Sequence, residues 1–168
     1  MSSVSYNIDQ TLDQFLKERH RVQEDQLGEI QRVHAIEGGG WAGHFVDAGI
    51  VTENELLQLI LTETGLPYIP LLQVNASDDL VNEFTSEFLQ TFECYPIERL
   101  GPVLTMATPN PFQPELVRSR ASRTDEVRLF VCRVSEWRER MRQMMEKDQK
   151  QKQEEKQRQK QKQKQKQK

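Results

Sequence analysis

Cysteine is scarce in this sequence, and long apolar runs are lacking. Cys94 and Cys132 are the only two cysteines among 168 residues, and neither has a second Cys or a His at metal-ligand spacing. We therefore predict buried free thiols rather than a disulfide framework. No stretch approaches the roughly 18 apolar residues of a membrane span, and the opening MSSVSYNIDQ lacks the basic and then apolar pattern of a signal peptide. We expect a cytoplasmic protein with room for one domain.

Motifs for catalysis and metal binding are also lacking. No Gly-x-x-x-x-Gly-Lys-(Ser/Thr) sequence is present, and Gly38–Gly40 is followed by Trp41, so the triple glycine predicts a hinge rather than a phosphate-binding loop. The histidines His20, His34 and His44 have no partner at i, i+4 that would complete a zinc site. Pairs of acidic residues fall at helix starts, where the helix dipole accounts for them. We therefore expect no enzyme activity, no metal and no cofactor.

The net charge of -3 conceals two regions of opposite sign. Residues 147–168 hold ten basic and three acidic residues, a net charge of +7, which leaves -10 for residues 1–146. From Gln149 onward only Gln, Lys, Arg and Glu occur, so the tail cannot form a packed core. We expect it to be disordered or a fraying helix that continues from the segment after Ser135.

The tail has three possible roles at this point. It could simply be solvated, it could tether the chain to an acidic partner or to its own body, or it could contact nucleic acid or acidic lipid. Contact with nucleic acid would be non-specific and salt-sensitive, because no aromatic residue or folded groove accompanies the charge. We therefore expect no specific nucleic-acid partner.

Apolar spacing predicts four short helices before Pro67. Helical spacing of apolar residues predicts the first helix over TLDQFL, the second from Val22 to Val33 and the third over WAGHFVDAGIV. Thr52-Glu53-Asn54-Glu55 has the form of a capping box that opens the fourth helix, and Gly65 offers its C-terminal stop. Each helix is too short to be stable alone.

These helices repeat. A shift of 29 residues superimposes Leu12 on Trp41 and Leu16 on Phe45, which defines two copies of 24 residues, 11–34 and 40–63. We expect neither copy to bury its apolar face alone, as in other repeat architectures.

After Pro67 the pattern changes to a mixture of helix and strand. Ser77 is a candidate N-cap for one helix over DDLVNEFTSEFLQ, and a short helix is expected from Pro114 to about Arg120. Strands are predicted at Tyr95–Arg99, Val103–Thr108 and Val127–Val134, with both cysteines inside strands.

The predicted fold class is α+β. We expect a helical subdomain of tandem helix pairs at residues 1–66 and a small α/β sandwich with a three- to four-stranded sheet at residues 67–146. Residues 147–168 form the Lys/Gln-rich, low-complexity tail.

Several long stretches of the sequence resemble a known family. The segments WAGHFVDAGIVTENELLQLILTETGLPYIPL and SDDLVNEFTSEFLQTFECYPIERLGPVLTMATPNPFQPEL, with the later SEWRERM, are similar to the MshE-type N-terminal domain of type II secretion and type IV pilus assembly ATPases. The resemblance covers roughly residues 10–145, and its most specific parts are AGIVTENEL followed by TGLPYIPL and the strand that leads into ATPNPF.

The resemblance implies a non-catalytic interaction or regulatory module without the hexameric motor. Its partner would be a protein of a secretion or pilus-like assembly, either a motor ATPase or an inner-membrane platform protein, so the chain would be cytoplasmic and could be peripheral at the inner membrane through that partner. Trp41, Phe45 and Val46, around the glycine hinge, are the candidate contact residues, although Trp41 also occupies an apolar position of the repeat, which favours a core role.

One branch of that family binds cyclic di-GMP through two tandem motifs with the same layout as the copies found here. Each family motif opens with Arg-Leu-Gly and ends in Gln, and this sequence departs from that pattern in both copies. The Arg positions hold Thr11 and Gly40, the Gly positions Asp13 and Ala42, and the Gln positions His34 and Glu63. We therefore do not expect cyclic di-GMP to bind. The alternative is a sensor with altered contacts from Trp41, His44 and Gly49.

Overall fold

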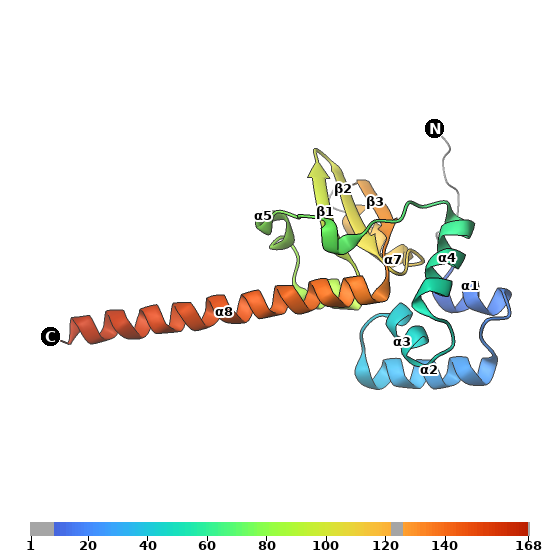
Figure 1. Cartoon of the computed structure of the whole chain (residues 1–168), viewed down its shortest axis with the longest axis horizontal. Coiled ribbons are helices and arrows are strands. Elements are labelled where there is room, and N and C mark those ends of the chain that lie inside the picture. The colour runs from blue at the N-terminus through green and yellow to red at the C-terminus, as the bar shows by residue number, and fades with distance from the viewer. Residues whose placement is uncertain (1–8, 122–125, 168) are drawn as a thin grey trace.

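Four helices come first in the chain, and Figure 1 shows them gathered on one side of the molecule. The computed structural model describes residues 9–121 and 126–167, so residues 1–8 of the predicted helical subdomain and Lys168 of the tail lie outside the described residues. The helices are α1 (Leu12–Glu18), α2 (Glu24–Glu37), α3 (Trp41–Asp47) and α4 (Glu53–Thr64).

The second helix pair repeats the first. Helices α3 and α4 begin 29 residues after α1 and α2, respectively. The turns between the helices of each pair also match, because His20 and Gly49 occupy equivalent positions with φ of 55° and 73°. Just after these residues, the amides of Arg21 and Ile50 donate to the carbonyls of Leu16 and Phe45. The chain therefore forms the same helix–turn–helix unit twice.

The two helix pairs bury their apolar faces in one shared core. Phe112 and Val131, from the later part of the chain, pack into it, and the rings of Phe15 and Phe112 stack with centroids 4.4 Å apart. Neither pair therefore encloses a core of its own. The buried residues that the pairs contribute are Leu12, Phe15, Leu16, Val22, Leu27, Ile30, Ala42, Phe45, Val51, Leu56, Leu57 and Ile60.

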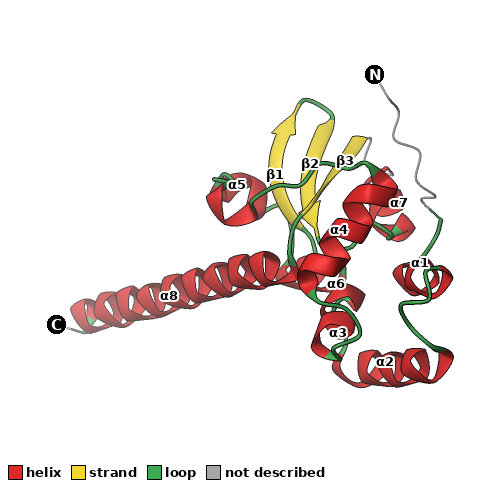
Figure 2. Cartoon of the chain, turned by 45° about the vertical axis from the view of Figure 1, so that its right-hand side comes forward, coloured by secondary structure: helices red, strands yellow, loops and turns green. Residues whose placement is uncertain are grey.

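The later part of the chain forms a three-stranded mixed sheet, which confirms the predicted α+β class. The strands lie in the order β1-β2-β3, with β1 antiparallel to β2 and β2 parallel to β3, and Figure 2 shows them side by side above α8. Helix α7 supplies the crossover that a parallel pair requires. The elements are η1 (Leu71–Gln73), α5 (Asp78–Val81), α6 (Ser86–Thr91), β1 (Tyr95–Leu100), β2 (Val103–Thr108), α7 (Pro114–Ala121), β3 (Glu126–Val131) and α8 (Val134–Lys166).

The single helix predicted after Ser77 is wrong, because the segment contains two helices. Ser77 caps α5, with its hydroxyl accepting from the Leu80 amide at 3.2 Å. Thr85 then caps α6, with its hydroxyl accepting from the Phe88 amide at 3.0 Å. A second N-cap starts a new helix in a new direction.

The C-terminal end of the third strand was also placed too late. Strand β3 ends at Val131, and Val134 already belongs to α8, because the Glu136 carboxylate accepts from the Arg133 amide at 3.0 Å and so favours a helix start there. Both cysteines lie just outside strands rather than within them, and both are buried and free.

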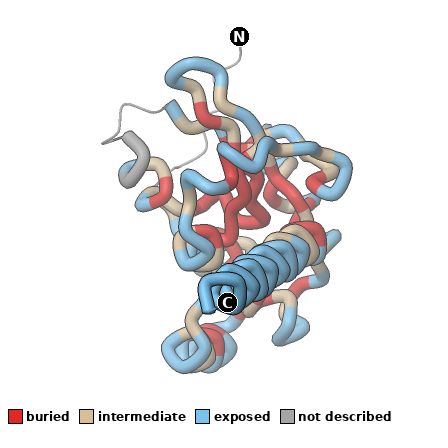
Figure 3. Tube along the Cα trace, turned by 90° about the vertical axis from the view of Figure 1, so that its left-hand side faces the viewer, coloured by how far each residue is buried: buried red, intermediate tan, exposed pale blue. Residues whose placement is uncertain are grey.

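Helix α8 continues without a break through the Lys/Gln-rich tail. Trp137 and Met141 of its first half are buried, whereas residues 145–167 are exposed. Figure 3 looks along this exposed part. We expected the tail to be either disordered or helical, and in the structure it is helical. Among the described residues, no helix is both long and apolar enough to cross a membrane.

The turns of the two helix pairs provide a matched test of backbone strain. Gly49 has φ of 73° and open space where a Cβ would lie, so Gly49→Ala should lower the free energy of unfolding by about 1 kcal/mol through conformation alone. His20 is exposed and holds the same left-handed conformation, so His20→Gly should be neutral or stabilising by up to about 1 kcal/mol. Urea unfolding measures both, and equal effects of the two substitutions would contradict the assignment.

Candidate functional site

A groove of about 570 Å³ lies where the helical pairs meet α6 and α8. We call it the junction groove. Its walls come from parts of the chain far apart in sequence, and both polar and apolar side chains line it. The helical pairs contribute Glu37, Gly38–Gly40, Gly43, His44 and Asp47. The segment from α6 to Glu93 contributes Glu87, Gln90, Thr91 and Glu93, and α8 contributes Trp137, Arg138, Met141, Arg142 and Met145.

Glu93 is the buried carboxylate at this junction. It is 2% exposed, and its Oε1 and Oε2 accept from the amides of Ala42 at 2.8 Å and Gly43 at 2.9 Å. These amides open α3 and have no partner within the helix. A negative charge there also matches the helix dipole. Glu93 therefore acts as an N-cap for α3, although α3 lies about fifty residues earlier in the chain.

Two glycines allow this approach. A Cβ on Gly40 would lie 1.7 Å from Cγ of Glu93, and a Cβ on Gly43 would lie 2.7 Å from Nη2 of Arg138. The equivalent of Gly40 in the first helix pair is Thr11, which needs no such space. The triple glycine therefore acts as a turn whose last residue makes room for a carboxylate, with Gly38 and Gly39 at positive φ.

The charge of Glu93 is balanced from several sides. Burial raises the pKa of Glu93, and the hydrogen bonds from Gly43 and Ala42 and the charge of Arg138 oppose that shift. Arg138 is bound in turn by Asp47, with its Nη1 and Nη2 at 2.9 and 2.7 Å from the two carboxylate oxygens. That pair holds the pKa of Asp47 below its usual value, mainly through the hydrogen bond, and it ties α3 directly to α8.

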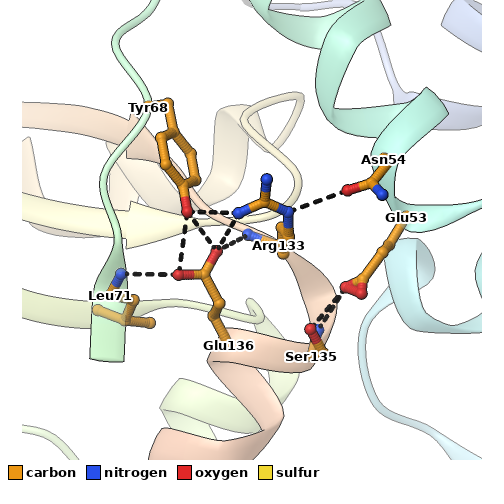
Figure 4. Close-up of polar contacts among 7 residues, drawn as sticks. All are labelled: Glu53, Asn54, Tyr68, Leu71, Arg133, Ser135 and Glu136. Carbon is orange, nitrogen blue, oxygen red and sulfur yellow. Dashed lines mark hydrogen bonds and ion pairs between the residues drawn. The ribbon is translucent and has the colours of Figure 1, made fainter. Parts of the chain in front are cut away.

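A second polar cluster joins α4, the segment after Pro67 and the start of α8 (Figure 4). The Glu136 carboxylate accepts from the Tyr68 hydroxyl at 3.0 Å and the Leu71 amide at 3.0 Å. Burial, followed by the hydrogen bond to Glu136, raises the pKa of Tyr68.

In the same cluster, side chains of α4 reach the start of α8. Glu53 accepts from the Ser135 hydroxyl at 2.6 Å and from the Ser135 amide at 3.3 Å, and Asn54 accepts from Nε of Arg133 at 3.0 Å. Glu53 thus caps α8 from the helical pairs, just as Glu93 caps α3 from the opposite side. The two parts of the chain exchange helix caps.

The residues predicted as altered nucleotide contacts are only partly brought together. Trp41 stacks on His34 with ring centroids 3.9 Å apart, and the ring of His44 meets His34 edge-on at 5.6 Å. Nε2 of His44 lies 2.7 Å from the Gly38 carbonyl. Gly49, by contrast, lies in the exposed turn between α3 and α4.

The two positions that hold Arg in the family motifs face different cavities. Thr11 lines a cavity of about 440 Å³ together with Trp41 and Gln31, whereas Gly40 lines the junction groove. Asp13 and Glu115 also line the cavity at Thr11, and their negative charges oppose an anionic ligand.

Of the three predicted contact residues, Phe45 was placed wrongly. It is 0% exposed, because it points into the shared core of the helix pairs. Trp41 and Val46 are half-buried at the edge of that core. Sequence reasoning missed Glu93 and Arg138, and the only local signal for them was glycine at two positions of the α3 start.

Among the described residues, no cluster of three or more His, Cys, Asp or Glu side chains could hold a metal ion. Burial raises the pKa of the Cys132 thiol well above its usual value, and a protonated thiol is a poor nucleophile.

In this fold a duplicated helix pair packs against a small mixed sheet. Residues 64–151, just over half of the chain, match the MshEN domain family. The chain belongs to that family, which confirms the resemblance seen in the sequence. The matched stretch spans the end of α4, the sheet and the first half of α8.

Two solved structures of one relative share the fold over most of the chain. Two crystal forms of the N-terminal domain of XpsE are similar, one with a TM-score of 0.56, 18% identity and coverage of 82% of this chain and 96% of that chain. The other has a TM-score of 0.51, 20% identity and coverage of 76% and 89%. A structure of MshE with cdg has a TM-score of 0.49, 18% identity and coverage of 80% and 98%. The curated protein sequences contain no match.

The Glu93 contact can be tested with a matched pair of substitutions. Glu93→Gln keeps the size of the side chain but turns one acceptor into a donor that faces an amide, so the free energy of unfolding should fall by about 1–3 kcal/mol. Glu87→Gln, at an exposed carboxylate that lines the same groove, should change it by less than about 0.5 kcal/mol. Urea unfolding provides the measurement. Equal effects of the two variants on the free energy of unfolding would show that Glu93 does not stabilise the junction.

His34 makes stability depend on pH. Burial, followed by the charge of His44, lowers its pKa, and no described residue hydrogen-bonds its buried Nδ1. Because the folded pKa lies below the unfolded value of about 6.5, the stability linked to the neutral ring is complete above that pH and is lost as the pH falls through the folded pKa.

His34→Phe should therefore keep the stack on Trp41 and reduce the loss of stability between about pH 7 and pH 5. His20→Gln, at an exposed histidine, is the control and should leave the pH profile unchanged. Urea midpoints across this range provide the measurement. An unaltered profile in His34→Phe would show that another group causes the acid sensitivity.

Proposed function

We propose that this chain is a non-catalytic interaction module that docks on a cytoplasmic partner of a secretion or pilus-like assembly. Membership of the MshEN domain family supports the class. The partner would be an inner-membrane platform protein or a motor ATPase, and the module would reach the inner membrane only through it.

The position of the Glu93 carboxylate is the observation that favours docking on a protein rather than nucleotide sensing. It occupies the two amides that open the second helix pair and brings a buried negative charge to that point. A cyclic dinucleotide carries two phosphates, which such a charge repels. The residues at the motif positions support the same choice, because neither Thr11 nor Gly40 offers the bidentate cation that suits a phosphate.

The docking surface we propose is the edge of the helical pairs beside the glycine turn. Trp41 and Val46 are half-buried there. Ile36, two residues before the turn, is 80% exposed and is the most exposed large apolar side chain among the described residues. Burial of such a side chain by a partner would stabilise the complex by about 1.5–3 kcal/mol.

Binding to purified partners tests this surface. The chain should bind the cytoplasmic domain of the platform protein or of the motor ATPase from the same organism in biolayer interferometry. Ile36→Ser should weaken that binding about tenfold or more, because it removes apolar area from the interface. Leu100→Ser is the matched control, since Leu100 is 65% exposed at the end of β1, and it should bind like the parent. Equal losses in both variants, or no binding to either partner, would contradict the proposed surface.

Cyclic di-GMP sensing is the second candidate, and the cavity beside Trp41 is the observation that favours it. Gln14 and Gln31 line that cavity with Trp41, so an aromatic face and two amides could meet a guanine base. Titration calorimetry with cyclic di-GMP separates the two functions. Micromolar binding that is lost in Trp41→Ala but kept in Ile36→Ser would replace docking by sensing, whereas the docking proposal expects no heat of binding.

A further inference from the structure

The second half of α8 is a helix that the rest of the chain leaves uncovered. Among the described residues, the last ion pair between α8 and the other elements joins Nζ of Lys147 to Asp78 at 2.8 Å. From there to Lys166 the helix rises about 30 Å at the usual 1.5 Å per residue, and Figure 1 shows it extending away from the other elements. Residues 145–167 are all exposed.

This exposed half of α8 has no apolar residue after Met145 with which to bind. After Met145 the chain contains only Glu, Lys, Asp, Gln and Arg, so neither a coiled-coil seam nor an apolar face for a membrane surface can form. The end of α8 can therefore recognise a partner only through charge and hydrogen bonds.

Its positive charge lies on two opposite sides of the helix. Arg158, Lys162 and Lys166 are spaced four residues apart and share one side. Lys160 and Lys164 are offset by two residues, about 200° around the helix, and form the second row. Like charges four residues apart weaken an isolated helix, so contact with a negatively charged surface would stabilise this one.

The helical pairs carry a net charge opposite to that of the tail. Residues 9–66 contain eleven acidic and four basic residues, a net charge of -7, against +7 for residues 147–168. Asp25, Glu37 and Glu55 are exposed there, and no described residue pairs with them. Within one chain the tail lies away from these helices, because the second half of α8 extends away from α1–α4 in both Figure 1 and Figure 2.

We propose that the free end of α8 docks on the acidic helical pairs of a second copy of this chain. The length of the helix supports this, because about 30 Å is several times the Debye length of about 8 Å at physiological ionic strength. The positive rod therefore acts outside the field of its own acidic body. The contact is head to tail, so two copies can exchange tails or several can form an open row.

This inference goes beyond docking on a machine partner and does not depend on it. Ile36→Ser, which should weaken partner docking, should leave self-association unchanged, so failure of one proposal is distinguishable from failure of the other.

Sedimentation velocity of the full chain gives the first test. Self-association should appear at about 10 mM salt, where the Debye length is about 30 Å, and disappear at about 1 M, where it is about 3 Å. A chain that remains monomeric at low salt, or associates equally at high salt, would overturn the proposal.

Charge variants of the full chain give the second test. The tail variant replaces Lys160, Lys162, Lys164 and Lys166 by Ala, and its control replaces the same four residues by Arg. The body variant is Asp25→Asn, Glu37→Gln and Glu55→Gln. The tail variant and the body variant should each weaken self-association about tenfold or more, because several opposite-charge contacts are removed together, whereas the Arg control should associate like the parent.

Mixing the two weakened variants tests the head-to-tail geometry. The tail variant supplies intact helical pairs and the body variant an intact tail, so an equimolar mixture should recover one contact per pair of molecules. Absence of recovery would overturn this geometry. Duplex DNA and phosphatidylserine vesicles, added to the parent, test the other polyanions. Tail-dependent binding to either by a chain that stays monomeric at low salt would also overturn the proposal.

Discussion

The bond between the Glu93 carboxylate and the opening amides of α3 is the constraint on which the rest of the structure depends. Burying a carboxylate is costly unless hydrogen bonds compensate it, and here two amides and the nearby Arg138 do so. The same contact satisfies helix donors that Gly40, which has no side chain, cannot satisfy. Two groups that would each be unfavourable alone are therefore stable only together.

The opposite arrangement also occurs at the junction, because a carboxylate of the helical pairs caps a helix of the later part of the chain. Glu53 of the helical pairs caps α8, and Asp47 of α3 binds Arg138 of α8. The two parts consequently hold each other by charge and helix dipoles at the surface of a shared apolar core. The exposed second half of α8 extends away from these packed parts (Figure 1).

Much of the fold could be predicted because its signals are local. The capping box at Thr52 and the stop at Gly65 mark α4 in the sequence, and the structure has the Thr52 hydroxyl accepting from Glu55 and Gly65 in the left-handed conformation. The helix after Ser77 was predicted wrongly, although Thr85 is also a good N-cap, because the apolar period runs through both helices. For the candidate site, Trp41 and Val46 stay predictions, whereas Phe45 was misplaced because helical period alone does not tell which side of a helix a partner element covers.

The sequence by itself determined the family, the duplicated helix pair, the α+β class and the opposite charges of residues 1–146 and the tail. Each of these depends only on composition or on residues close together in the chain. Only the tertiary structure decided which carboxylate meets which helix. The Glu93 and Ala42 partners are 51 residues apart, and the energy of their contact depends on burial and geometry that exist only once the core has formed. The direction of α8, and thus its distance from its own acidic helices, was decided in the same way.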